Sequence, residues 1–296
     1  MNAAMDAADA VASFPALVLA GHGTRDPAGQ AVIAELVARV RALVPGIDVV
    51  AAHLDHQRPG IGEALAALVA GGTTRAAVVP LLLSAATHSK TDVASAVARA
   101  RAELPRLSVS YGRPLGPHPA LLNAVEDRLA EAGVDPDDPG TAVVLASAGA
   151  SDPDANGDIA KTARLLWEGH DWAAVEPAFA SATKPSVTEV IGRLRRLGIP
   201  RVVVVPYFLA PGRLTSRVIG QAYHAGGDMV TAVVGAHPAV ASLVVDRYRE
   251  ALRNEVLMNC DTCVHRAPLR GRPVAVGAPF AAPSVTPFVT EREAVG

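Results

Sequence analysis

Short apolar runs alternate along the chain with longer segments whose apolar residues recur every three or four positions. The continuous apolar run over residues 16–20 predicts a strand, and the spacing over 29–43 predicts a helix. The same alternation predicts further strands over 48–54, 76–83 and 107–111, and further helices over 61–70, 91–104 and 119–132. Strands that are apolar on both faces and separated by helices are typical of a parallel sheet covered on both sides.

This pattern occurs twice. The segment FPALVLAGHGTRDPAG recurs as TAVVLASAGASDPDAN, which pairs Asp26 with Asp152 at an offset of 126 residues. The same offset pairs Pro80 with Pro206, and near the end of each unit His118 pairs with His237 at an offset of 119. A register held through strands, loops and helices indicates two copies of one domain, the second of them seven residues shorter.

The predicted fold class is therefore α/β, with two tandem, duplicated domains that each hold a four-stranded parallel sheet flanked by helices. A Pro/Asp/Gly linker, DPDDPG, separates the two copies. We divide the chain into a mobile leader, a first domain, a second domain and an extended tail with both cysteines, over residues 1–14, 15–134, 141–255 and 256–296.

Composition narrows the functional class. Half of the 296 residues are hydrophobic, which is ample for a buried core. The net charge of −2 provides no global field for nucleic acid or an anionic membrane, and neither is expected as a partner. No apolar run reaches the length of a membrane helix, and the leader lacks the basic start of a secretion signal. We expect a soluble cytoplasmic protein, and the sequence leaves open whether it forms oligomers.

Three loops at strand ends carry the candidate chemistry. The first predicted strand ends in GHGTRDP with His22, the second is followed by Asp55 and His56, and the third leads to His88. Ligands of parallel sheets bind beyond the carboxyl ends of the strands, so these loops should face one cleft. Imidazole and carboxylate are suitable ligands for divalent iron, cobalt, nickel or zinc.

The second copy lacks these side chains. At the offset of 126, the positions of His22, Asp55 and His88 are taken by Ala148, Ser181 and Leu214. Structural residues such as Gly23, Asp26 and Pro59 keep their counterparts. If the histidines served folding, the second copy should have retained some of them. We infer an active first copy and a second copy that forms the other wall of the cleft and lacks the catalytic His.

Other interpretations stay open. A His at a strand end is often an ordinary loop residue, and His53 can lie along its strand facing the sheet. His118 and His237 precede Pro at matched helix starts, which favours a structural role. The Gly21-x-Gly23 pair suggests a dinucleotide loop, but Asp26 stands where the third Gly belongs and no phosphate-loop Lys follows.

The GHGTRDP loop, the acidic residue before Pro59 and the segment LLLSAATHSKTDV resemble the sirohydrochlorin chelatases of the CbiX/SirB type, the ATP-independent class II enzymes, in their duplicated long form. The resemblance implies insertion of Co²⁺ or Fe²⁺ into sirohydrochlorin, on the way to cobalamin or sirohaem. It implies that His22 and His88 handle the metal and that Asp55, at a position where Glu is frequent, is a third catalytic residue. The alternative is a non-enzymatic metal-binding or delivery protein with the same His pair.

Basic residues near these loops suit the carboxylates of such a substrate. The candidates are Arg25, Arg58 and Lys90 in the first copy, and Lys184 and Arg213 in the second. Each of them can equally be an ordinary solvated surface charge.

Both cysteines, Cys260 and Cys263, lie in the tail with two residues between them. Long chelatases of this family have a similar Met-x-Cys-x-x-Cys motif associated with an iron–sulfur cluster, and the resemblance implies one here. Two cysteines are half of the four thiolates that a cluster normally takes, so an unoccupied thiol pair is the alternative.

Overall fold

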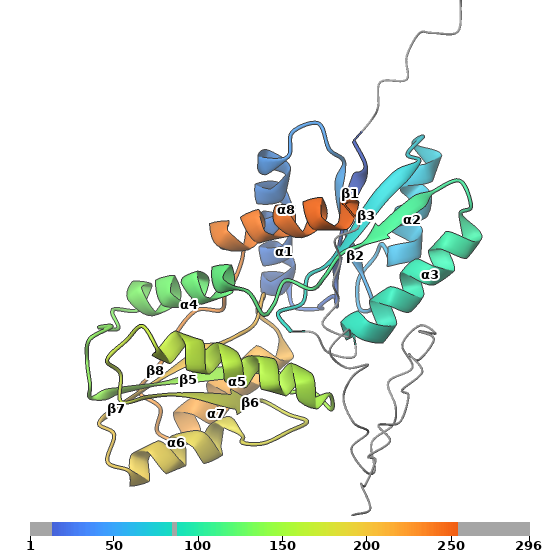
Figure 1. Ribbon diagram of the computed structural model, residues 1–296. Helices are drawn as coiled ribbons and strands as arrows, with labels where there is room; N and C mark the ends of the chain where they lie inside the picture. Colours follow the sequence, from blue (N-terminus) through green and yellow to red (C-terminus); the bar gives the residue numbers. More distant parts are fainter. Residues whose placement is uncertain (1–13, 85–87, 254–296) are drawn as a thin grey trace, which may run out of the picture.

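The computed structural model describes residues 14–84 and 88–253 (Figure 1), with residues 88–90 described by their backbone alone. It contains two four-stranded sheets in the orders β2-β1-β3-β4 and β6-β5-β7-β8. Every strand pair in them is parallel. The predicted fold class, with its duplicated sheets and flanking helices, is confirmed.

The first repeat follows the predicted order of elements. Its strands are β1 (Ala16–Gly21), β2 (Val49–His53), β3 (Arg75–Pro80) and β4 (Ser108–Tyr111). Its helices are α1 (Pro27–Leu43), α2 (Ile61–Ala70), α3 (Ala94–Glu103) and α4 (Pro119–Glu131). One prediction is wrong in detail: the helix expected over 91–104 is a π-helical turn, η1 (His88–Val93), followed by α3.

The second repeat has the same order of strands and helices and is shorter near its C-terminal end. Its strands are β5 (Thr141–Ser147), β6 (Ala174–Phe179), β7 (Arg201–Pro206) and β8 (Met229–Val230). Its helices are α5 (Pro153–Trp167), α6 (Val187–Arg196), α7 (Arg213–His224) and α8 (Pro238–Leu252). The seven missing residues fall between β7 and β8, because Val78 pairs with Tyr111 in the first sheet and Val204 with Val230 in the second.

Two histidines begin the closing helices of the repeats. The Nδ1 atom of His118 accepts a hydrogen bond from the N–H of Ala120 at 3.2 Å, and that of His237 accepts one from Ala239 at 3.2 Å. Each imidazole thus accepts a hydrogen bond from a backbone N–H in the first turn of its helix, where such groups have no partner within the helix. The structural role expected for both residues is confirmed.

The repeats exchange these closing helices. Helix α8 of the second repeat packs on α1 and β3 of the first, and α4 of the first packs on β7 and α5 of the second. Figure 1 shows α8 in orange beside α1 in blue. A sheet face in each repeat is therefore covered by a helix that belongs, in sequence, to the other repeat.

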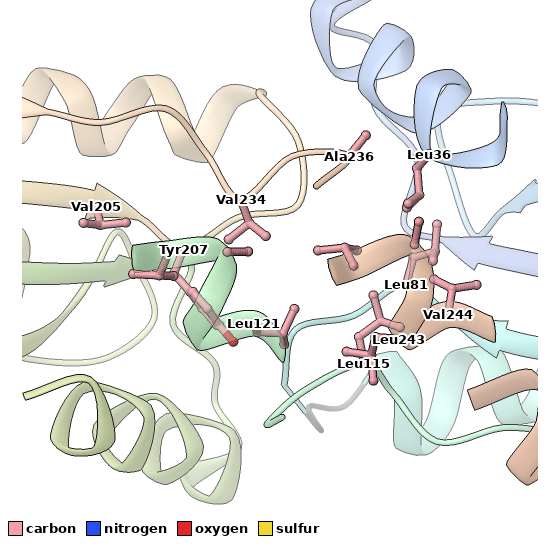
Figure 2. Packing of buried hydrophobic residues seen from close by; sticks show 14 of the residues in the cluster. Leu36, Leu81, Leu115, Leu121, Val205, Tyr207, Val234, Ala236, Leu243 and Val244 are labelled. Atoms are coloured by element: carbon pink, nitrogen blue, oxygen red, sulfur yellow. The ribbon is translucent and has the colours of Figure 1, made fainter. Parts of the chain in front are cut away.

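One apolar core results from the exchange. Side chains of β1 alternate, so that Leu17 and Leu19 point into this core while Val18 faces α2 and α3 on the other side of the sheet. The core continues through α8 and α4 to residues of the second repeat such as Tyr207, which Figure 2 shows beside Leu121 of α4. Burial of this continuous apolar surface holds the two repeats together.

A buried arginine fastens α8 to the first repeat. Arg247 is only 2% exposed and donates to the carbonyl oxygens of Pro114 at 2.9 Å and Leu115 at 3.1 Å. Its guanidinium also pairs with Glu250 at 2.9 Å, and Glu250 pairs with Arg113 at 2.9 Å. Burial lowers the pKa of Arg247. The network ties the helix to the chain segment that leads from β4 to α4.

We expect Arg247→Ala to lower the free energy of unfolding by about 3–5 kcal/mol, since it leaves the buried carbonyl oxygens of Pro114 and Leu115 without a partner and Glu250 with Arg113 alone. Urea denaturation measures the loss. The control is Arg249→Ala on the same helix, whose side chain is 59% exposed and pairs with Asp246 at 3.6 Å. The control should lose less than about 1 kcal/mol. Equal losses in the two variants would contradict the role of Arg247.

Candidate functional site

The loops after β1 and β2 meet at the carboxyl edge of the first sheet. Strand β1 lies between β2 and β3 in the sheet, so loops from all three strands leave this edge as neighbours. The hydrogen bonds of the ladder continue beyond the strands: Leu54 donates to the Gly21 carbonyl at 3.0 Å and Asp55 to the His22 carbonyl at 2.9 Å. Two of the predicted site residues, His22 and Asp55, are therefore held together by backbone contacts.

Gly23 makes this close approach possible. Its φ angle is +90°, and a Cβ atom built on it would lie 1.9 Å from the carbonyl oxygen of Asp55. No other residue fits such a position without moving the second loop. The loop is fixed again at its next residue, because Thr24 donates its N–H to the side-chain oxygen of Gln57 at 3.0 Å. The glycine of the GHG motif thus sets the spacing of the site.

His56 joins the site from the second loop. Its ring centroid lies 5.8 Å from that of His22, and the two ring planes are nearly perpendicular, at 87°. Asp55 contacts it twice: one carboxylate oxygen accepts the His56 N–H at 2.7 Å, and the other lies 3.4 Å from the ring Nδ1. Sequence reasoning placed His56 in this loop but did not select it. The signal was available, since the Asp-His pair is replaced by Ser181-Ala182 in the second copy.

The second repeat has the same loop backbone without the imidazoles. Gly149 has a φ of +79° where Gly23 has +90°, and Ala182 has +62° where His56 has +65°. Ser181 donates to the Ala148 carbonyl at 3.1 Å, as Asp55 does to His22. The left-handed backbone at His56 is therefore a property of the duplicated fold. What distinguishes the first repeat is the chemistry of the side chains placed on it.

His88 begins η1, which follows β3, the neighbour of β1 in the sheet. Residues 85–87 and the side chains of residues 88–90, Lys90 included, lie outside what the structure describes. The convergence of the His22 and His88 imidazoles stays a prediction. Among the described residues, no group of three or more His, Cys, Asp and Glu is arranged to hold a metal ion.

Two of the predicted substrate-binding cations are engaged in internal ion pairs. Arg58 pairs with Glu63, and Lys184 pairs with Glu189 at 3.0 Å. The two pairs occupy matched positions at the starts of α2 and α6, where both glutamates also accept a backbone N–H. The Ser186 N–H and Lys184 lower the pKa of Glu189 to about 2. In both repeats, therefore, the glutamate that pairs with the cation also caps the helix.

Arg213 approaches the first loop from the second repeat. It begins α7 directly after Pro211 and Gly212. A Cβ on Gly29 would lie 2.4 Å from the Pro211 carbonyl oxygen, and one on Gly212 would lie 3.6 Å from the Thr24 hydroxyl. The two repeats thus touch beside the GHGTRDP loop. Arg213 and Arg25 are both exposed there.

His53 lies beneath the site. It ends β2, is 7% exposed, and its Nδ1 has no hydrogen-bond partner among the described residues. Burial lowers its pKa. The matched residue of the second repeat is Phe179, which is 4% exposed. The interpretation in which His53 lies along its strand and faces the sheet is therefore confirmed.

A cavity of about 350 Å³ lies at the amino-terminal edge of the first sheet, against Arg75, Ser108 and Leu252. It contains none of the predicted site residues, and it lies at the other end of the strands from the loops that carry them. The candidate site is therefore the open carboxyl edge.

Comparisons with known proteins agree with this placement. The family model CbiX matches residues 16–132 and 142–251, one segment in each repeat. The sirohydrochlorin cobaltochelatase of Priestia megaterium is 34% identical over 259 residues, 84% of this chain and 84% of that protein. The sirohydrochlorin ferrochelatase of Bacillus subtilis (strain 168) is 31% identical over 243 residues, 81% of this chain and 92% of that protein.

Solved structures give the same result. SirB from Bacillus subtilis with Fe³⁺ has a TM-score of 0.72 and 31% identity, and the match covers 81% of this chain and 97% of that one. SirB from Bacillus subtilis subspecies spizizenii in complex with cobalt has a TM-score of 0.69 and 29% identity, with 81% and 96% covered.

The burial of His53 predicts a stability that depends on pH. Because its pKa is lowered in the folded state, the unfolded chain takes up a proton there at higher pH than the folded chain does. Stability should therefore fall as the pH drops below about 6.5. We expect His53→Phe to reduce this fall, measured as the difference between urea midpoints at about pH 8 and pH 5. The matched variant Phe179→His should increase it, and an unchanged difference in both variants would contradict the assignment.

Proposed function

This chain belongs to the CbiX family, and we propose from that membership that it inserts a divalent metal ion, Co²⁺ or Fe²⁺, into sirohydrochlorin. The observation that carries the proposal is the asymmetry of the duplicated edge. His22 and Asp55 lie on loops whose backbone the second repeat reproduces with Ala148 and Ser181. Relatives that match most of the chain are sirohydrochlorin cobalto- and ferrochelatases. Their names support metal insertion as the reaction for which the first repeat retains these side chains.

Metal insertion sets two requirements. The two pyrrole N–H groups must lose their protons, and the ion must arrive with part of its water shell removed. A neutral imidazole can hold the ion at one face of the ring and can then accept a proton. We assign the metal to His22 and His88 and a share of the proton transfer to Asp55. Protein coordination has to be incomplete, because a closed site would keep the ion.

The substrate is expected to lie at the carboxyl edge with its carboxylates toward basic side chains. Arg25 and Arg213 suit this role because both are exposed and each follows a residue at the contact between the repeats, Thr24 in the first and Gly212 in the second. Arg58 and Lys184 would have to leave Glu63 and Glu189 to bind the substrate. Lys90 completes the proposed set.

The test is the absorbance change of sirohydrochlorin when Co²⁺ or Fe²⁺ enters the ring. We expect the protein to accelerate it, and His22→Ala or His88→Ala to reduce the rate by roughly 100-fold or more with folding intact. His224→Ala, which removes an exposed His at the end of α7, is the control and should keep the full rate. Metal binding without acceleration would contradict the proposal and support the delivery protein instead. A series of metals in the same assay distinguishes cobalt from iron.

For the cysteine pair we propose a thiol site, and the residues fit an iron–sulfur cluster poorly. Cys260 and Cys263 lie outside the described residues and are the chain's two cysteines, whereas a cluster normally takes four thiolates. Iron and acid-labile sulfide in anaerobically purified protein measure cluster content. We expect neither in stoichiometric amount, and full activity after Cys260→Ser; a stoichiometric cluster would contradict this.

None of the helices in the described part of the chain has the length and apolar character that a membrane crossing needs. We propose that the protein acts in the cytoplasm on a free tetrapyrrole.

A further inference from the structure

We propose that His56 is an additional ligand that shares the incoming metal ion with His22, and that Asp55 positions the His56 ring. The inference rests on the proposed function for the assignment of metal to His22. It adds an imidazole from the loop after β2 that neither the repeat nor the fold requires.

The spacing of the two rings suits one shared ion. The His22 and His56 centroids are 5.8 Å apart, and the planes are nearly perpendicular. Two imidazoles bound to one ion at about 2.1 Å place their centroids on the order of 5–6 Å apart, so the observed separation of the rings is compatible with one shared ion. The His56 side chain is 33% exposed, which leaves it accessible to an ion from solvent.

Asp55 holds His56 in the way that carboxylates hold metal-binding histidines. One oxygen of Asp55 accepts the backbone N–H of His56 at 2.7 Å, and the other lies 3.4 Å from its Nδ1. A carboxylate at Nδ1 favours the tautomer with the proton on that atom, which makes Nε2 the donor to a metal. For ion binding, Asp55 then acts through His56.

The duplicated loop shows that His56 is not needed for the turn. Its φ of +65° is a conformation that L residues seldom adopt, and Ala182 adopts +62° at the matched position. The backbone therefore directs this side chain toward the edge in both repeats. This position holds His56 in the repeat that also has His22 and Asp55, and it holds Ala182 in the repeat that lacks them.

Incomplete coordination by the protein suits an ion that must leave again. The described residues form no group of three or more metal-binding side chains. An ion on His22 and His56 keeps its other positions open for further ligands and then for the pyrrole nitrogens. Such a site collects the ion at the edge and remains open for transfer.

The experiment begins with Co²⁺ alone, titrated into the full-length protein by equilibrium dialysis with the visible absorption of bound cobalt as a second readout. We expect His56→Ala to weaken Co²⁺ binding by roughly tenfold or more, and Asp55→Asn by roughly tenfold. His224→Ala is the control for adventitious binding at a surface histidine and should bind as the unmodified protein does. Circular dichroism establishes that each variant is folded.

The double variant separates positioning from direct coordination. If Asp55 acts through His56, then Asp55→Asn should cause no further loss of affinity in the His56→Ala background. If the two losses add, Asp55 contacts the ion itself and the positioning role is wrong.

Metal insertion completes the test. In the sirohydrochlorin assay, His56→Ala should raise the KM for Co²⁺ by roughly tenfold and should keep kcat within a few-fold when Co²⁺ is saturating. Unchanged Co²⁺ binding and KM in His56→Ala, with both impaired in His22→Ala, would overturn the inference and leave the proposed function intact. If the unmodified protein inserts no metal, the proposed function fails, and the Co²⁺ titration still decides the role of His56.

Discussion

The exchange of α4 and α8 is the constraint on which the rest of the structure depends. Each helix leaves its own repeat and covers an apolar face of the other, so the two sheets share one core. Because the core must be closely packed, the repeats cannot shift relative to one another without opening it. The seating of Pro211 against Gly29 beside the GHGTRDP loop follows from this arrangement. The second repeat thereby becomes a fixed neighbour of the site.

The duplication also separates what the backbone does from what the side chains do. The loop after β1 is built from a glycine with positive φ, a carbonyl that accepts from the next loop, and an aspartate that caps a helix. All three features occur in both repeats, and none uses an imidazole. The second repeat could therefore lose its candidate ligands without losing the loop. The fold forms with small side chains at those positions, as it does with Ala148, Ser181 and Ala182.

Most of the fold could be predicted from sequence because it rests on local signals. Hydrophobic periodicity gave the strands and helices, and the constant offset gave the duplication. The exchange of helices could not be predicted, because an amphipathic pattern shows that a face is buried and not what buries it. The ion pairs of Arg58 and Lys184 were not predicted, although their partners Glu63 and Glu189 stand at matched positions of the two repeats. The orientation of His56 depends on a positive φ at a non-glycine residue, for which the sequence has no local signal.

His53 shows how the site affects the packing beneath it. Its repeat partner, Phe179, fills the same buried place with a ring that needs no hydrogen bond, whereas the Nδ1 of His53 has no partner among the described residues. A buried imidazole without a partner costs free energy that a phenyl ring does not. The first repeat carries this less stable choice directly under the loops of His22 and Asp55, and the second does not. The difference follows the division of roles between the repeats: the second retains the packing that stabilises the shared fold, and the first carries polar groups where the chemistry is expected.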